Sequence, residues 1–109
     1  MRRVNEAVRE VLSDAIKTLK DPRVGFVTVT DVRTSPDLRH AKVFVSVLGT
    51  ADERAATMDG LASAHGVLQT AVNRELRMKR TPTLDFVYDD TAERADRMER
   101  LLAEMEQDA

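Results

Sequence analysis

The fold of this chain is decided by residues 61–80, LASAHGVLQTAVNRELRMKR, where the pattern predicts two helices with a break between them. The break falls at Ala64-His65-Gly66, and the second helix gains basic residues toward its end. A break of this kind exposes a helix N-terminus, where free N–H groups and the positive end of the helix dipole favour phosphate. The alternative is a helix that bends at a glycine for packing alone.

The bulk properties predict one small globular domain in the cytoplasm. The chain has 109 residues, of which 42% are hydrophobic and 33% are charged, a balance typical of folded proteins. It has no cysteine and only two histidines, far apart in sequence, so neither a disulfide framework nor a metal site is expected. No apolar run reaches the length of a membrane span, and no signal peptide follows the start.

Charge is distributed unevenly along the chain. The net charge is −2, which by itself disfavours a nucleic-acid partner. Residues 1–50, however, hold nine basic and six acidic side chains, and residues 91–109 hold three basic and six acidic ones. Such asymmetry can place a basic surface on an acidic protein, although it is also compatible with ordinary solvated surface.

The first half of the chain predicts a helix and a β-hairpin. Apolar residues at three-four spacing predict a helix over residues 4–20, which Asp21-Pro22 ends. Alternating residues predict strands over 25–34 and 39–48, joined by the turn residues Ser35-Pro36-Asp37. The alternation slips at Asp31-Val32, which predicts a β-bulge.

The second half adds the broken helix, one strand and a last helix. Thr50 or Asp52 can cap the broken helix, whose second part is expected to run to Thr81-Pro82. A strand follows over residues 83–89. Asp90 and Glu93 stand at capping-box spacing before a helix over 91–107, which we expect to pack on the domain. It could alternatively mediate an oligomer or fray.

These elements predict an α+β fold in a single domain, with a core over residues 4–90. The two hairpin strands pair antiparallel, and a right-handed crossover through the broken helix makes the last strand parallel to the second. The result is a three-stranded mixed sheet with helices on one face and the other face open.

This order resembles the type II KH domain, which clamps single-stranded nucleic acid at a GXXG loop between two helices. Ala64-His65-Gly66 is similar to the kink that replaces that loop in the ribosome-binding factor A family. Residues 35–43 (SPDLRHAKV) resemble the hairpin signature of that family. Residues 76–82 and 84–90 resemble its helix-to-strand signature. The resemblance covers residues 4–102, and it departs at Val67, where a larger residue is expected.

The resemblance implies a small-subunit assembly factor that is not an enzyme. Family members bind immature, free small ribosomal subunits and their ribosomal RNA. They assist late maturation, including processing of the RNA 5′ region, and they are linked to growth in the cold. It implies a monomer without cofactor, small-molecule substrate or membrane contact.

The candidate RNA-binding residues lie in four places. If the second helix continues, Arg74, Arg77 and Arg80 share one row, while Lys79 points elsewhere. His65 could stack on a base, but an exposed filler is favoured. The complete predicted set comprises the kink, that row, two hairpin residues and a flexible N-terminal arm: Ala64, His65, Gly66, Arg74, Arg77, Arg80, Arg39, Lys42, Arg2 and Arg3.

Two other functions are compatible with parts of the sequence. Catalysis would need a nucleophile–base pair, a metal cluster or paired carboxylates, and capping explains the adjacent Asp89-Asp90. No catalytic residue is therefore predicted. A protein–protein interaction module with a KH-like fold, docking through the last helix or the open sheet face, is the main alternative. Its binding would be insensitive to salt, whereas phosphate binding weakens steeply as salt rises.

Overall fold

The structure, a computed structural model, describes residues 2–78 and 80–108 and confirms the predicted α+β fold. Lys79 lies outside the described residues. The element order is the predicted one, with bounds that differ by a few residues: α1 Arg2–Lys17, β1 Phe26–Thr34, β2 His40–Leu48, α2 Ala51–Ser63, α3 His65–Leu76, β3 Thr83–Tyr88 and α4 Thr91–Asp108.

The three strands form one mixed sheet in the order β1-β2-β3. β1 and β2 pair antiparallel, and β2 and β3 pair parallel, as the crossover through α2 and α3 requires. The register shifts between Val29, opposite Val45, and Asp31, opposite Phe44. Thr30 is thus the extra residue of a β-bulge, one position before the predicted slip.

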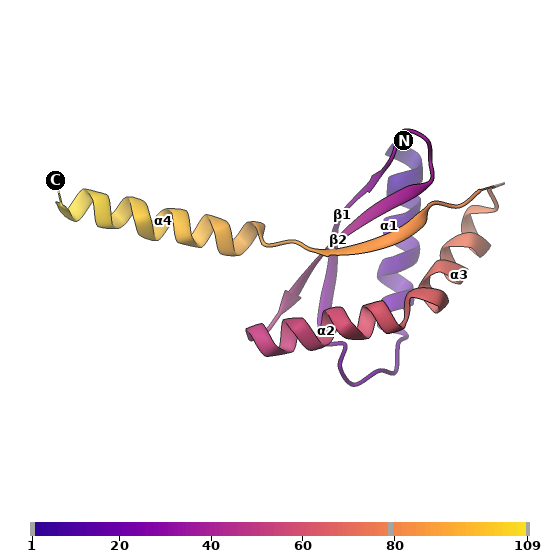
Figure 1. The fold of residues 1–109 in the computed structure, drawn as a ribbon, viewed down its shortest axis with the longest axis horizontal. Coiled ribbons are helices and arrows are strands. Elements are labelled where there is room, and N and C mark those ends of the chain that lie inside the picture. The colour runs from indigo at the N-terminus through magenta and orange to yellow at the C-terminus, as the bar shows by residue number, and fades with distance from the viewer. Residues whose placement is uncertain (1, 79, 109) are drawn as a thin grey trace.

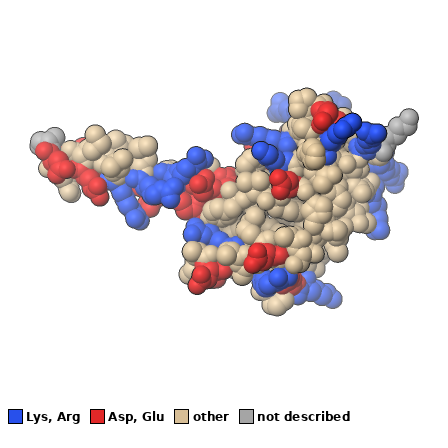
Figure 2. Space-filling view, viewed as in Figure 1, with Lys and Arg blue, Asp and Glu red and all other residues tan. Residues whose placement is uncertain are grey.

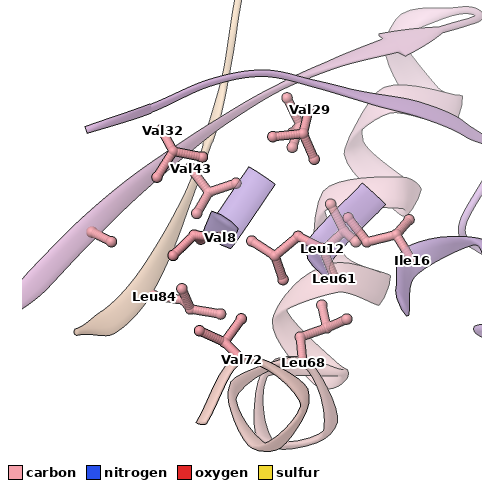
Figure 3. Packing of buried hydrophobic residues seen from close by; sticks show 12 residues of the cluster. Val8, Leu12, Ile16, Val29, Val32, Val43, Leu61, Leu68, Val72 and Leu84 are labelled. Atoms are coloured by element: carbon pink, nitrogen blue, oxygen red, sulfur yellow. The ribbon is translucent and has the colours of Figure 1, made fainter. Parts of the chain in front are cut away.

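The core lies between the sheet and the helical layer of α1, α2 and α3, which cover one face (Figure 1). Side chains from all of these elements point toward one another there (Figure 3). The predicted stripe of α1 supplies three of them, and alternate residues of the strands supply the sheet side. The buried cluster comprises Val8, Leu12, Ile16, Val29, Val32, Ala41, Val43, Val45, Leu61, Leu68, Val72 and Leu84.

Turn and capping chemistry holds the connections as the sequence predicts. At the hairpin, the Asp37 carboxylate accepts hydrogen bonds from the Ser35 hydroxyl at 2.6 Å and the Arg39 amide at 3.0 Å. These bonds, the first above all, lower the pKa of Asp37. At α2, Thr50 and Glu53 form a capping box in which each side chain accepts the amide of the other.

α4 does not pack on the domain, contrary to the expectation from its apolar stripe. It projects as an arm on the side away from α3 (Figure 1), and none of residues 91–108 is buried. The molecule consequently measures 59 Å along its longest axis and 17 Å along its shortest. The apolar stripe correctly indicated that this segment is a helix. What the helix packs against depends instead on where β3 ends and on the direction in which the chain leaves the sheet.

The predicted Asp90–Glu93 capping box is also replaced by another anchor. Glu93 turns toward the domain, where it accepts the Tyr88 hydroxyl and pairs with Arg54 at 3.2 Å. The first turn of α4 is held instead by Asp89, whose carboxylate accepts the Thr91 amide at 3.0 Å. Capping-box spacing was misleading here because the Glu93 side chain, at the third helical position, bonds Tyr88 on β3 and Arg54 on α2 instead.

Candidate nucleic-acid interface

The kink between α2 and α3 is made by one residue. Ala64 has φ −87° and ψ 5°, ends α2 and precedes α3. Its amide donates to the Gly60 carbonyl at 3.0 Å, and its carbonyl accepts the Leu68 amide at 3.0 Å. Among the described residues, no side chain caps the N-terminus of α3. The first turn of α3 therefore presents its positive dipole end without an acidic side chain to neutralise it.

His65 fastens this kink to the sheet. Its Nε2 lies 2.8 Å from the Leu84 carbonyl oxygen, so this nitrogen donates. Its ring meets Phe86 edge-on, with 6.4 Å between the ring centroids. The residue is half-buried rather than the exposed filler that the sequence favoured. Its imidazole orients the kink relative to β3, which makes it a positioning residue.

Gly66 leaves the backbone of the kink accessible. It is exposed, it lies in α3 without a positive φ, and a Cβ built there meets nothing within 4 Å. The neighbouring Val67 is 65% exposed, so the departure from the family pattern does not disturb the packing. A phosphate group can thus reach the first turn of α3 without displacing any side chain.

A row of residues continues from Gly66 along the outer face of α3. The Thr70 hydroxyl donates to the Gly66 carbonyl at 2.8 Å, and Arg74 follows one turn later. With Val67 and Ala71, these residues line a shallow depression. Gly66 and Arg74 were predicted from the sequence, whereas Thr70 and Val67 were not. The position of Thr70, four residues from each of Gly66 and Arg74, was a signal for a shared helical face.

The predicted row of Arg74, Arg77 and Arg80 does not exist. α3 ends at Leu76, and Arg77 adopts the left-handed conformation, with φ 48° and ψ 34°. Arg80 lies in the connection to β3. The helix ends five residues before the predicted Thr81, because the left-handed Arg77 closes its C-terminus: the Arg77 amide donates a hydrogen bond to the Asn73 carbonyl.

The structure instead brings Arg77 and Arg80 to one end of the molecule with other predicted residues. The Arg39 carbonyl accepts the Thr83 amide at 2.8 Å, which places the hairpin beside the α3–β3 connection. Asn5 accepts the Thr34 amide at 3.1 Å, which places the start of α1 beside the same hairpin. We call this group the basic end: Arg2, Arg3, Arg39, Arg77 and Arg80.

All five side chains of the basic end are exposed. Arg2 and Arg3 belong to the first turn of α1 and are not a flexible arm, and Arg2 pairs with Glu6 at 3.4 Å. Lys and Arg gather on this side of the molecule, opposite the tip of α4 (Figure 2). Three elements that are distant in sequence thus build one cationic surface.

Two other surfaces carry less positive charge than the basic end: the open sheet face, which holds the predicted Lys42, and the groove between α1 and α3. Lys42 stands on the open sheet face between Arg33 and Asp85, away from the kink. On the same face the Arg33 guanidinium lies 5.4 Å from the centre of the Phe44 ring. On the other side of Arg74, the groove between α1 and α3 is lined by three acids: Glu10, Asp14 and Glu75. A phosphate chain would therefore follow the Thr70 side of α3.

Within residues 2–78 and 80–108, no three His, Cys, Asp or Glu side chains are grouped so as to hold a metal ion. Over the same residues, no helix has both the length and the apolar character of a membrane span.

Fold and kink together define this protein as a type II KH-like domain with a helical kink in place of the nucleic-acid-binding loop. The family model for ribosome-binding factor A matches residues 1–102. The chain therefore belongs to the ribosome-binding factor A family.

Individual relatives agree with this assignment. The ribosome-binding factor A of Halothermothrix orenii is 44% identical over 108 residues, which cover 98% of this chain and 88% of that protein. The crystal structure of ribosome-binding factor A from Thermus thermophilus superimposes with a TM-score of 0.72 at 29% identity, covering 80% of this chain and 92% of that one. A homology model of the Thermus thermophilus factor, fitted into a cryo-EM map of its 30S complex, gives 0.65 at 29% identity, covering 78% and 90%.

Proposed function

We propose that this protein binds the small ribosomal subunit through its ribosomal RNA and assists late maturation of that subunit. Family membership supports binding to the ribosome, and a Thermus thermophilus relative has been fitted into the map of a 30S complex. The observation that carries the RNA contact is the basic end, where arginines from α1, the hairpin and the α3–β3 connection converge.

The interface we propose has two parts. The Gly66, Thr70 and Arg74 row accepts one stretch of phosphate backbone against the uncapped start of α3. The basic end accepts a second stretch, where guanidinium groups bind phosphate oxygens. Ala64 and His65 shape the kink rather than touch RNA, and Lys42, on the open sheet face between Arg33 and Asp85, lies outside both parts.

The charge of the basic end sets an expected salt dependence. If its five arginines each contact one phosphate, the log–log slope of affinity against salt is about −3.5 for single-stranded RNA. Affinity would then fall roughly a hundredfold between about 50 and 200 mM salt. A protein–protein interaction module would change little over that range.

The test is co-sedimentation with free small subunits, large subunits and whole ribosomes at low and high salt. We expect selective, salt-sensitive binding to free small subunits. The double variant Arg39→Glu/Arg80→Glu should lose most of this binding. Lys17→Glu/Lys20→Glu, which reverses two exposed charges near the other end of α1, is the matched control and should bind normally. Equal losses in both variants would show that the basic end is not the interface.

The remaining parts of the proposal concern the cell. We infer a cytoplasmic, monomeric and non-catalytic factor that needs no cofactor and supports processing of the RNA 5′ region, with greatest demand in the cold. A deletion strain should accumulate small-subunit RNA with an unprocessed 5′ end, most strongly at low temperature. Complementation by wild type, but not by Arg39→Glu/Arg80→Glu, would tie this defect to the basic end.

A further inference from the structure

α4 exposes an apolar stripe that contacts nothing else in the described chain. Four large side chains recur at the spacing of one helical face and are between 51% and 61% exposed: Met98, Leu101, Leu102 and Met105. Scattered exposed leucines need no explanation, but a continuous stripe on a projecting helix marks an interaction surface. Figure 1 shows that this helix extends away from the body of the protein.

The base of α4 is fixed firmly enough to present the stripe in one direction. Asp89 accepts the Thr30 hydroxyl at 2.7 Å and the Thr91 amide at 3.0 Å. On the helix itself, Glu93 accepts the Tyr88 hydroxyl and pairs with Arg54. Bonds from two strands and α2 thus hold the first turn, and the stripe begins beyond them.

The charges of α4 indicate what covers the stripe. The far turns carry Glu104, Glu106 and Asp108, and the last turn contains no basic residue. Acids at a helix C-terminus oppose the helix dipole, and an isolated helix of this length is marginal in water. A partner that supplies cationic groups around the tip, and an apolar floor for the stripe, would offset both effects.

Two other occupants fit less well. Against a second copy, Arg94 and Arg100 are already paired with Asp90 and Asp96 of their own helix, so they are less available to a second acidic tip. An RNA strand would be repelled by the same acids.

We propose that α4 docks its Met/Leu stripe into a basic-rimmed apolar groove of a protein carried by the small ribosomal subunit. This inference rests on the proposed function, because it places the partner on the particle that the basic end binds. The basic end and α4 point to opposite sides of the molecule (Figures 1 and 2), so one molecule can contact RNA and protein together.

The test compares two probes: free small subunits, and small-subunit RNA stripped of protein. In the full-length double variant Met98→Gln/Leu102→Gln, polar side chains that keep helix propensity replace the centre of the stripe. We expect at least tenfold weaker binding to small subunits and binding to the bare RNA within twofold of wild type. Ala103→Gln, on the opposite face of α4, is the matched control and should match wild type on both probes.

Each other outcome overturns the inference. Equal losses on both probes would assign the stripe to RNA, and no loss on either would leave it without a docking role. Sedimentation that shows a wild-type dimer, absent in the double variant, would assign the stripe to a second copy. If wild type binds small subunits and the double variant binds equally well, only this inference fails. If wild type itself does not bind, the proposed function fails as well.

Discussion

Replacing Gly66 by alanine should make this protein more stable and a weaker binder at the same time. Gly66 lies in the first turn of α3 without a positive φ, and an added Cβ meets nothing within 4 Å. Alanine can therefore adopt the native conformation without strain. Within residues 2–78 and 80–108 a methyl there obstructs no neighbouring group, so its effect on binding would come from a group that approaches from outside the molecule.

The stability gain follows from the unfolded state. Alanine has fewer accessible backbone conformations than glycine, so this substitution at an unstrained site adds about 0.4–1 kcal/mol to the free energy of unfolding. For a domain of this size, that corresponds to a rise in Tm of roughly 2–6 °C. Thermal unfolding monitored by circular dichroism measures it directly.

The binding loss follows from the proposed contact. A hydrogen bond to a charged group contributes about 1.5–3 kcal/mol, so losing one amide–phosphate bond should lower affinity roughly 10- to 100-fold. Filter binding to free small subunits at fixed salt measures this loss. Gly66→Val should lose at least as much while keeping most of the fold. Ala55→Val, at an exposed position of α2, controls for a branched side chain on a helix surface.

Two results would refute this reasoning. If Gly66→Ala binds as well as wild type, no phosphate approaches the kink. If Gly66→Ala lowers Tm, the glycine is needed by the fold. Opposite signs for stability and affinity are the signature of a residue kept for contact rather than for packing.

Three further predictions concern stability. Gly60→Ala should have the opposite effect to Gly66→Ala, a loss of about 1–3 kcal/mol in urea unfolding, because its Cβ would lie 2.7 Å from Val24 Cγ2; a neutral result would mean that Val24 moves aside. Leu12→Ala should cost about 2–5 kcal/mol, because Leu12 is fully buried, and a loss below that range would show that the core closes over the cavity. Asp89→Asn should lower the free energy of unfolding by about 1–2 kcal/mol at pH 7. Hydrogen bonds from Thr30, the largest single cause, and from Thr91 lower the pKa of Asp89 from 3.8 to about 2, so the folded state favours the charged carboxylate. The carboxylate contributes this stability fully above the pKa of Asp89 in the unfolded chain, and the contribution disappears as the pH falls through about 2. In urea unfolding, the free energies of wild type and variant should therefore differ at pH 7 and converge near pH 2. A difference that stays constant with pH would contradict the charge argument.

The type and order of the elements can be read from local patterns in the amino-acid sequence. Val8, Leu12 and Ile16 in α1 recur at helical spacing, so a helix places all three on one buried face. The alternating apolar residues of β2 share one face only in a strand. The hairpin followed from Ser35-Pro36-Asp37, because that chemistry is local. The crossover rule then decided the parallel pairing of β2 and β3. Local patterns and handedness sufficed because these features depend on neighbouring residues.

The tertiary structure decided which functional residues share a surface. Arg77 left the predicted row because a left-handed C-cap is a single-residue event that leaves no periodic signal. Arg77 instead lies at the same end of the molecule as Arg39, because a backbone hydrogen bond between Arg39 and Thr83 holds the hairpin beside the start of β3. The apolar stripe of α4 did not reveal that it lacks a partner within the described chain, because periodicity specifies a buried face without specifying what buries it. Long-range placement depends on the whole packed core, and no local pattern encodes it.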